Sequence, residues 1–421
     1  MSYVGHGGKE IIERVITDPA EAAAKVSGLT KIPIRGQIAR EIIGIAYGFF
    51  SPLEGFMGRA DVDAVCEHMT LAGGAVWSIP IVFDMSDGEL AEYGIKEGDT
   101  VLLAYQNQPM AALAVEEIYS FDKTKIAQSV YGTTDGKHPG VARTFAYKDK
   151  FIGGKIILVN QPKINPPYDK FFLTPIQTRQ KFAEKGWKRI VAHQTRNVPH
   201  TGHEWLMKGS WLQTHGDAPV EKIETGLLVN AIIGEKRKGD YIDEAIVLCQ
   251  DVLRTAGYFR EDTHMTSITL WDMRYAGPKE AIFHAILRTN LGLTHHMFGR
   301  DHAGVGTYYD PYDAHRIFDR LPPGALDIKP VRVLEWWYCP VCAEVAYMGL
   351  CGHTRERQNF SGTLIRSIIQ DGVKPPRLIF RPEVFDLIME TAGKYGFGSP
   401  FVTDQYLQNR NPVFTLPPMN I

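Results

Sequence analysis

Hydrophobic positions in the first part of the chain, up to about residue 165, occur in short runs rather than in long amphipathic stretches. Turn-forming residues separate these runs, for example at 86–88 (Ser-Asp-Gly) and 97–99 (Glu-Gly-Asp). Short apolar runs bounded by such residues are typical of β-strands. We therefore predict an N-terminal domain of mixed or mostly β structure, with strands at 77–83, 100–104, 111–115 and 155–159.

A proline-rich segment follows this domain. Residues 160–168 (NQPKINPPY) contain three prolines in nine positions. Because proline fixes φ and lacks a backbone donor, we interpret this segment as a linker. With a second boundary near residue 330, the predicted domains are 1–167, 168–330 and 331–421.

Beyond the linker, the apolar periodicity changes to an alternation of strands and helices. Thr174-Pro175 has the form of an N-cap followed by proline, which opens a helix to about Lys185. Strands are predicted at 189–192, 265–270 and 294–298, and further helices at 202–214, 241–256 and 278–291. This alternation predicts an α/β domain with a parallel, helix-covered sheet, which binds ligands beyond the carboxyl ends of its strands. The last domain opens with an aromatic run at 331–338 and is smaller.

Composition and charge narrow the possible functions. The chain has 421 residues, of which 44% are hydrophobic and 22% charged, as in ordinary globular proteins. Lys and Arg total 46 against 48 Asp and Glu, so the net charge of −2 gives no general basis for binding nucleic acid or an acidic membrane. No apolar run reaches the roughly eighteen residues of a membrane helix, and the N-terminus lacks the pattern of a signal peptide. We therefore expect a cytoplasmic protein.

The first candidate site is the segment 194–203 (QTRNVPHTGH), which follows a predicted strand and precedes a helix. Gln194 and Arg196 point to the same side of an extended chain, where an amide and a guanidinium can hold a tetrahedral oxyanion such as sulfate. His200 and His203 can face the same way from the first helical turn, whose backbone N–H groups favour an anion. An isolated HxxH is a weak signal in a chain with 14 histidines, and a lone Arg after a strand is usually a solvated charge. The concentration of all these groups in ten residues favours a functional site.

A second candidate is the segment 299–306 (GRDHAGVG), which follows the predicted strand at 294–298. Successive backbone N–H groups of a glycine-rich loop can form an anion-binding concavity. The alternative is a tight turn with a surface Arg–Asp pair, because glycine-rich loops alone are a weak signal.

These segments resemble motifs of a known family. QTRNVPHTGHE resembles the QxRNPxHxxH pattern of ATP sulfurylases, with Val198 between Asn197 and Pro199 as a departure, and its HTGH core is similar to the HxGH motif of nucleotidyltransferases. Further strings similar to motifs of the family are GRDHAG (299–304), MRYAGPKEA (273–281) and GFFSPLEGFM (48–57). We interpret the last two as a loop with a helix cap, which could also shape the pocket, and as a packing element.

The resemblance implies a PUA-like N-terminal domain, a central Rossmann-like nucleotidyltransferase domain and a small C-terminal α/β domain. It corresponds to the bacterial and archaeal type without a fused kinase domain, and no GxxxxGKS string occurs in the sequence. It further implies the conversion of ATP and sulfate into adenylyl sulfate and diphosphate, or the reverse reaction. Mg²⁺ would accompany the ATP, and the protein would form a homodimer or a larger homo-oligomer.

The resemblance also implies roles for individual residues. Thr195, Arg196 and Asn197 would be catalytic and would line the α-phosphate. Sulfate would contact Gln194, Arg196 and the backbone of Ala303. The residues implied to bind ATP are Gln194, Thr195, Arg196, Asn197, His200, His203, Gly299, Arg300, Asp301, His302 and Val333.

Three of the five cysteines lie close together with a histidine: Cys339, Cys342, Cys351 and His353. Clustered Cys and His residues favour tetrahedral zinc, and four protein ligands would make it a structural ion. Some relatives in the family carry zinc here. Free thiols are the alternative, and His353 is the weakest candidate ligand, because the single residue between it and Cys351 makes joint chelation tight. The cysteines at 66 and 249 are expected to be buried apolar residues.

Two alternative functions and one further motif stay open. The segment 361–366 (SGTLIR) resembles the ISSTxxR loop of nucleotidyltransferases, but we favour a simple N-cap for a helix at 363–370. The first alternative is a nucleotidyltransferase with another acceptor, such as a phosphorylated vitamin precursor. The second is a zinc-containing, PUA-like RNA-binding protein, against which the near-neutral charge argues.

Overall fold

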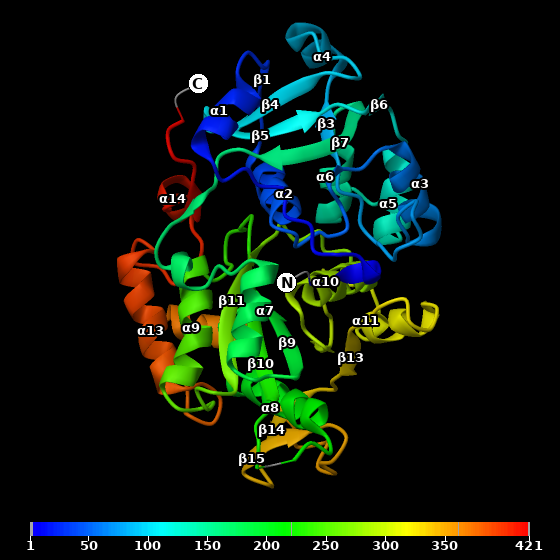
Figure 1. Cartoon of the computed structure of the whole chain (residues 1–421). Helices are drawn as coiled ribbons and strands as arrows, with labels where there is room; N and C mark the ends of the chain where they lie inside the picture. The colour runs from blue at the N-terminus through cyan, green and yellow to red at the C-terminus, as the bar shows by residue number, and fades with distance from the viewer. Residues whose placement is uncertain (1–2, 220, 361, 420–421) are drawn as a thin grey trace.

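The computed structural model describes residues 3–219, 221–360 and 362–419 (Figure 1). In Figure 1 the blue and cyan N-terminal part lies above the green central part, and the orange and red segments border the central part at the left and below. One continuous hydrophobic core runs through the N-terminal and central parts. Among the described residues, no helix has the length and apolar character that crossing a membrane requires.

The N-terminal part is built on a seven-stranded sheet with the order β1-β4-β5-β7-β2, in which β3 and β6 also pair with β7. Its strands are β1 Lys31–Pro33, β2 Gly55–Phe56, β3 Phe83–Met85, β4 Thr100–Tyr105, β5 Gln108–Ala114, β6 Glu117–Tyr119 and β7 Lys150–Leu158. Its helices are η1 His6–Gly8, α1 Pro19–Val26, α2 Gly36–Ala46, α3 Arg59–His68, α4 Asp87–Tyr93, α5 Lys123–Tyr131 and α6 Pro139–Phe145. The predicted strands at 100–104, 111–115 and 155–159 are confirmed as parts of β4, β5 and β7, except that Val115 and Val159 lie one residue beyond the strand ends. The helices make this part mixed, one of the two possibilities predicted.

The predicted strand at 77–83 is wrong for all but its last residue. Only Phe83 belongs to a strand, β3, whereas residues 77–82 are buried without regular structure. Ser78 among them donates its hydroxyl hydrogen to the carbonyl of Lys279 in the central part (2.6 Å). The apolar run therefore reflects packing between two domains, a cause that periodicity alone does not separate from a buried strand.

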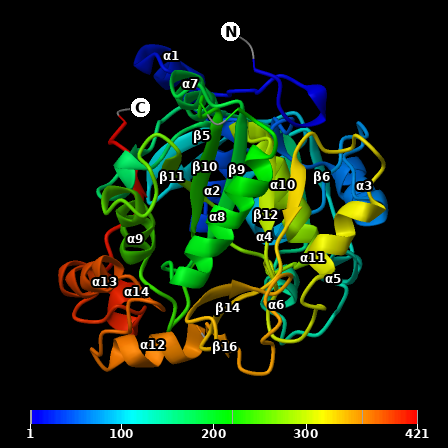
Figure 2. The same ribbon diagram turned by 90° about the horizontal axis from the view of Figure 1, so that it is seen from below.

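The central part contains a five-stranded parallel sheet with the order β11-β10-β9-β12-β13. Its strands are β9 Arg189–Thr195, β10 Thr225–Ile233, β11 His264–Leu270, β12 His295–Phe298 and β13 Lys329–Arg332. Its helices are η2 Tyr168–Lys170, α7 Pro175–Glu184, α8 Thr201–His215, α9 Asp243–Thr255, α10 Pro278–Leu291, α11 Asp313–Arg316 and η3 Ile317–Arg320. The predicted parallel, helix-covered sheet is confirmed, and Figure 2 shows α8 and α10 against it.

Two local features of the central part bear on the predictions. Thr174 caps α7 as expected, because its hydroxyl accepts a hydrogen bond from the backbone N–H of Gln177 (3.3 Å). Strand β10, which lies between β11 and β9, was not predicted, although all nine of its residues are buried. A continuous apolar run of this kind is typical of a parallel strand covered on both faces. β13 spans residue 330, where we place a boundary, and the boundary itself stays a prediction.

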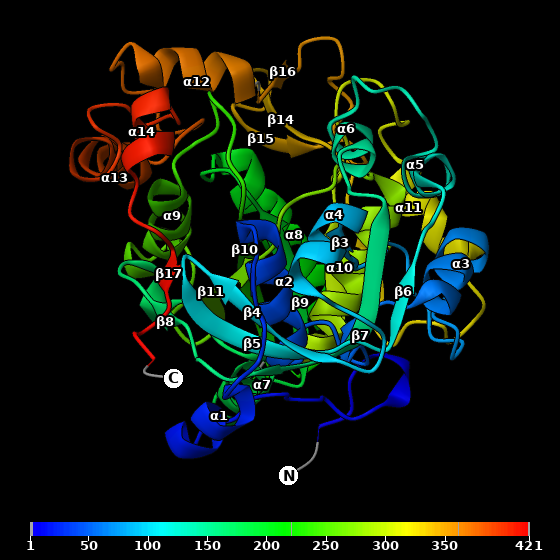
Figure 3. The same ribbon diagram turned by 90° about the horizontal axis from the view of Figure 1, so that it is seen from above.

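The C-terminal part consists of a small antiparallel sheet, ordered β15-β14-β16, and helices that pack on the central part. Its elements are β14 Trp336–Cys339, β15 Glu344–Tyr347, β16 Gln358–Asn359, α12 Gly362–Gln370, α13 Pro382–Lys394, α14 Asp404–Asn409 and β17 Phe414–Thr415. Helix α13 lies on α9, and Figures 2 and 3 place α12 beside the small sheet. The last strand, β17, returns to the proline-rich segment and pairs with β8 Lys163–Ile164. The connection between the first two domains is therefore held by strand pairing with the C-terminal part.

Candidate functional site

The two candidate loops converge because their strands are neighbours. β9 and β12 pair in parallel, with His295 opposite Val191, so their carboxyl ends lie side by side. The loops at 194–203 and 299–306 leave the sheet together and border a cavity of about 530 Å³, a size typical of small-ligand sites. The predicted residues that line this cavity are Gln194, Thr195, Arg196, Asn197, His200, His203, Gly299, Arg300, Asp301, His302 and Ala303.

A larger hollow of about 870 Å³ lies elsewhere, between the N-terminal part and residues 320–325. Its charged groups already pair with one another in part, as Lys155 does with Glu54 (3.2 Å). The hollow contains neither candidate loop. The chemistry of the site therefore belongs to the smaller cavity.

Arg196 is held in place by aromatic and acidic partners. It donates a hydrogen bond to the hydroxyl of Tyr275, its guanidinium lies 5.0 Å from the centre of that ring, and the carboxylate of Asp240 is 3.4 Å away. Burial opposes the charge on Arg196, but Tyr275 and Asp240 outweigh it and raise the pKa of Arg196 above its ordinary value. The cavity therefore has a permanent, oriented cation on its wall.

The two histidines at the start of α8 form a stacked pair, with ring centres 3.8 Å apart. Nδ1 of His200 accepts the backbone N–H of His203 (3.3 Å), and Nδ1 of His203 accepts that of His200 (3.5 Å). Burial lowers the pKa of His203 to about 4 and that of His200 well below its ordinary value. Both rings are therefore neutral at pH 7 with the proton on Nε2, so each Nε2–H can donate a hydrogen bond to an anion.

Gly202 is required by close packing in the same turn. A Cβ added there would lie 2.6 Å from the ring of Phe360 and 2.9 Å from Cε1 of His200. Phe360 stacks on His200 at 5.2 Å, so the C-terminal part supports the histidine pair directly.

The second loop combines left-handed backbone with a buried link to the first. Asp301 and Ala303 have positive φ values of 54° and 56°, and alternating backbone conformations of this kind direct successive N–H groups toward one anion. Nε2 of His302 lies 3.2 Å from Nδ1 of the fully buried His284, whose Nε2 is 3.4 Å from the amide nitrogen of Gln194. Burial lowers the pKa of His302 to about 3 and that of His284 well below its ordinary value. A neutral bridge therefore ties the two loops together.

Several side chains that line the cavity were not predicted as site residues. Tyr275 and Met273 come from the 273–281 segment, which we had favoured as a loop and helix cap. The C-terminal part contributes Leu334, Glu335, Trp336, Asn359 and Phe360, and the remaining side chains are those of His193, Leu206 and Met297, while Gly202 and Gly304 belong to the two candidate segments. The resemblance of the MRYAGPKEA string was the available signal for Tyr275, whereas nothing in the sequence pattern indicated the residues after 333.

The structure also places two other predicted features, Val333 and the SGTLIR segment. Val333 is 5% exposed and donates its backbone N–H to the carbonyl of Phe298 (3.0 Å), and the cavity wall is formed by its neighbour Leu334 instead. The helix favoured at 363–370 is confirmed as α12, which begins at Gly362, while Ser361 of the same motif lies outside the described residues. Arg366 of this helix donates to Oδ1 of Asn197 (3.0 Å), so the SGTLIR segment does reach the site.

The cysteine cluster forms a compact group of potential metal ligands. Nδ1 of His353 lies 3.3 Å from Sγ of Cys342, 3.7 Å from Sγ of Cys339 and 3.8 Å from Sγ of Cys351. The four ligand atoms all lie within 4.8 Å of one another. Tetrahedral coordination with ordinary zinc distances would separate N from S by about 3.6 Å, so the group fits one metal ion and His353 belongs to it. Of the other cysteines, that at 249 is buried as expected and that at 66 is only partly so.

Comparisons with known proteins agree with this geometry. The family model described as ATP-sulfurylase matches residues 169–391, and a PUA-like domain model matches residues 3–161. The sulfate adenylyltransferase of Archaeoglobus fulgidus is 40% identical over 96% of this chain and 95% of its own length. Those of Cenarchaeum symbiosum and Hyperthermus butylicus are 43% and 41% identical, each over 91% of this chain and 96% and 95% of their own.

A solved structure supports the fold alone. The hexameric APS kinase from Thiobacillus denitrificans matches with a TM-score of 0.69 at 19% identity, over 92% of this chain and 68% of that one. Together with the two domain models, it agrees with an N-terminal PUA-like domain followed by an α/β nucleotidyltransferase domain. On the family model and on relatives that match over nearly their full length, this chain belongs to the ATP-sulfurylase family.

Proposed function

We propose that this protein is a sulfate adenylyltransferase, which joins the α-phosphate of ATP to sulfate and releases diphosphate. The observation that carries the proposal is the meeting of two anion-binding loops at one cavity of about 530 Å³. The cavity combines the cation of Arg196 with the neutral donors His200 and His203 and with the left-handed backbone at 301–303. Two adjacent anions, sulfate and the phosphates of ATP, need such a set of donors.

On the sulfate side, we assign binding to Gln194, Arg196 and the backbone of Ala303. Tyr275 and Asp240 already hold Arg196, so its planar fork can meet an oxyanion with little reorganisation. Sulfate is an anion at neutral pH, and its attack therefore needs no general base.

On the nucleotide side, the phosphates would lie along the start of α8 and residues 299–302. A sulfate oxygen attacks the α-phosphorus in line, a new S–O–P linkage forms, and the bond to the β-phosphate breaks, so that its electron pair leaves with diphosphate. His200 and His203 donate Nε2–H hydrogen bonds to the charge that develops on the phosphates. Because Arg366 donates to Oδ1 of Asn197, the Nδ2 of Asn197 is the atom that can donate to the α-phosphate, beside Thr195.

Catalysis in this scheme consists of orientation and of stabilising charge at the α- and β-phosphates. Mg²⁺ would accompany the nucleotide, held mainly by phosphates and water, and would offset part of their charge. For Cys339, Cys342, Cys351 and His353 we propose zinc, because three thiolates and an imidazole at tetrahedral spacing match its preferences. Four protein ligands leave no open position, so this ion would stabilise the C-terminal part without joining the reaction.

The test is diphosphate release from Mg-ATP with and without sulfate, together with ATP formation from adenylyl sulfate and diphosphate. Arg196→Ala should reduce the sulfate-dependent rate by on the order of a thousandfold while the fold persists, as removal of one preorganised donor does elsewhere. Arg316→Ala is the matched control, because Arg316 at the end of α11 is exposed and, among the described residues, forms ion pairs with the nearby Asp310 and Asp313 only. Near-normal turnover of Arg196→Ala would contradict the assignment.

The relatives give no support to the two alternative functions, and their tests are simple. A panel of acceptors would reveal a different nucleotidyltransferase, and an RNA mobility-shift assay at moderate salt would reveal an RNA-binding protein. A homodimer or larger homo-oligomer stays a prediction, which light scattering of the purified chain can check. The physiological direction depends on the enzymes that supply or remove adenylyl sulfate, because its formation alone is uphill.

A further inference from the structure

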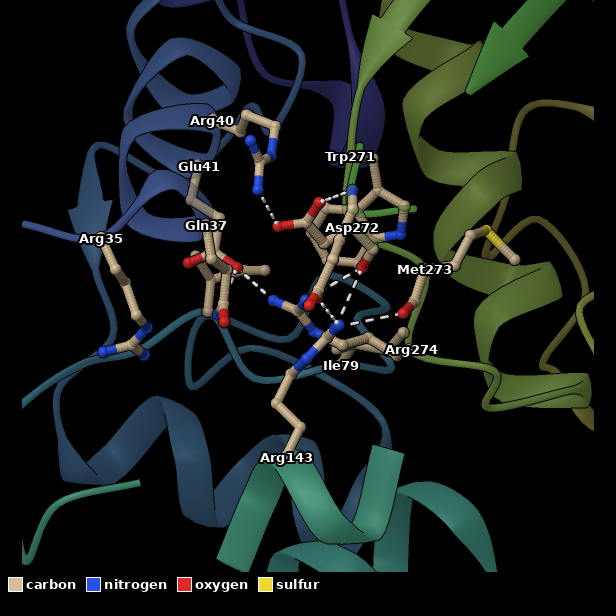
Figure 4. Close-up of polar contacts among 12 residues, drawn as sticks. Arg35, Gln37, Arg40, Glu41, Ile79, Arg143, Trp271, Asp272, Met273 and Arg274 are labelled. Atoms are coloured by element: carbon tan, nitrogen blue, oxygen red, sulfur yellow. Dashed lines mark hydrogen bonds and ion pairs between the residues drawn. The ribbon is translucent and has the colours of Figure 1, made fainter. Parts of the chain in front are cut away.

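The segment 272–275 forms one wall of the cavity and is also the place where the N-terminal domain reaches the site. Met273 and Tyr275 line the cavity. Tyr275 has a positive φ of 59°, a conformation that is unfavourable for such a residue and persists only where its surroundings enforce it. The preceding residues of the segment are held by side chains of the N-terminal domain: Figure 4 shows Arg40, Glu41 and Arg143 around Asp272, Met273 and Arg274.

Helix α2 of the N-terminal domain holds the side chains of Asp272 and Arg274 in this segment. Arg40 donates to Oδ2 of Asp272 (2.7 Å), and Glu41 forms an ion pair with Arg274 in which both side chains are 2% exposed. Arg274 also donates to the carbonyl of Asp272 (2.9 Å) and lies 4.5 Å above the ring of Trp271. Figure 3 shows α2 between the N-terminal sheet and the central part, where it can make these contacts.

Helix α6 of the same domain and the residue that precedes it, His138, hold the backbone carbonyls of Met273 and Tyr275. Arg143 donates to the carbonyl of Met273 (3.1 Å). Nδ1 of His138 accepts two backbone N–H groups at the start of α6, so its proton is on Nε2, which lies 3.1 Å from the carbonyl of Tyr275. The side chains of Arg143 and His138 therefore fix the carbonyl groups of Met273 and Tyr275, the two residues of this segment that line the cavity.

The central domain also holds the backbone of this segment. Glu280 of α10 accepts hydrogen bonds from the backbone N–H groups of Arg274 (2.9 Å) and Ala276 (3.1 Å). The side chain of Tyr275 is thereby presented to Arg196, to which its hydroxyl is hydrogen bonded, and its ring also faces Arg237 at 4.3 Å.

We propose that the PUA-like domain is a positioning element of the active site, and that Arg143 and His138 are positioning residues. They act through Tyr275, whose hydroxyl orients the guanidinium of Arg196 for sulfate. The inference rests on the proposed function in so far as sulfate is the ligand of Arg196. It gives the N-terminal domain a role in the reaction, without any contact of its own with substrate.

The kinetic test uses the full chain and five single variants. Arg143→Met and His138→Asn remove the bonds to the two carbonyls, and Tyr275→Phe removes the hydroxyl that they position. Ser78→Ala is the matched control, because it removes a hydrogen bond between the same two domains that ends on Lys279, outside the segment. We expect the KM for sulfate to rise on the order of tenfold in the first three variants, as small displacements of a positioned group produce, with the KM for Mg-ATP changed less than about twofold. Arg143→Lys should recover part of the loss.

Comparing the double variant with its single variants separates a positioning effect from a general loss of stability. If Arg143 acts through Tyr275, the variant with both Arg143→Met and Tyr275→Phe should be no worse than Tyr275→Phe alone, since the two changes remove one interaction chain. Additive effects would overturn the proposal, as would an unchanged KM for sulfate in folded Arg143→Met.

Amide hydrogen exchange gives a readout that does not need activity. Peptides that cover residues 271–277 should exchange faster in Arg143→Met than in the wild type and in Ser78→Ala. If the wild type released no diphosphate in response to sulfate, the proposed function would fail, and exchange would still decide whether the N-terminal domain holds the segment. Equal exchange in all three proteins would overturn the positioning role.

Discussion

Replacing His264 with Leu should make the protein less sensitive to acid. His264 begins β11, outside the set of residues that line the cavity. It is 1% exposed, and within the described part of the chain neither of its ring nitrogens has a hydrogen-bond partner. Burial lowers the pKa of His264 to about 3, and the charges of Arg254 and Lys185 act in the same direction.

The size of the effect follows from the linkage between protonation and folding. An ordinary histidine has a pKa of 6.5, so between pH 6.5 and about 3 the unfolded chain binds a proton at residue 264 that the folded chain excludes. The stability associated with this residue is therefore fully present above pH 6.5 and is lost as the pH falls through that window. At pH 5 the loss is about 2 kcal/mol, because protonation favours the unfolded ring roughly thirtyfold. Leu cannot bind the proton, so the variant avoids this loss.

The assay is thermal unfolding of the wild type and His264→Leu at pH 8 and at pH 5. On going from pH 8 to pH 5, the free energy of unfolding of the variant should rise by about 2 kcal/mol relative to that of the wild type, equivalent to a few degrees in Tm. His68→Gln is the control for removing a histidine as such, because His68 is exposed, and its Tm should follow that of the wild type. A difference between His264→Leu and the wild type that is the same at both pH values would refute the reasoning.

Two further predictions concern the metal group and the domain interface. A chelator or Cys342→Ser should release about one zinc ion per chain, measured by mass spectrometry, and lower the Tm by removing a closed metal site, whereas Cys66→Ser should keep the ion. Glu41→Gln should lower the free energy of unfolding in urea by about 3 kcal/mol, because it leaves Arg274 buried without its charge partner, and the double variant with Arg274→Met should recover part of this loss. Retention of zinc by Cys342→Ser, or equal stability of Glu41→Gln and the wild type, would contradict these expectations.

The meeting of the two loops could be predicted from sequence because it depends on local rules. Residues 194–203 and 299–306 each follow a buried strand, and the carboxyl ends of neighbouring parallel strands share one edge of a sheet. The N-cap at Thr174 was predictable for the same reason, since the capping interaction involves only residues three positions apart.

The parts of the site that were missed depend on long-range packing. Arg366 reaches Asn197 across a separation of 169 residues; the resemblance of SGTLIR to the ISSTxxR loop was the available signal, but periodicity and capping rules do not indicate such a contact. The role of Tyr275 depends on a left-handed backbone that the other domain enforces, and Tyr is not a residue that favours this conformation. His353 lies with the three cysteines although only one residue separates it from Cys351, and its Nδ1 is 3.8 Å from Sγ of that cysteine.

The pairing of β17 with β8 has a consequence for the order in which this chain can assemble during synthesis. Phe414 and Thr415 lie opposite Ile164 and Lys163, and the side chain of Asn160 donates to the carbonyl of Pro417 (2.9 Å), about 250 positions further along. A nascent chain leaves the ribosome from its N-terminus, at roughly 5–20 residues per second. The junction between the first two domains therefore waits for its partner strand for more than ten seconds, and it closes only after residues 414–417 have been translated.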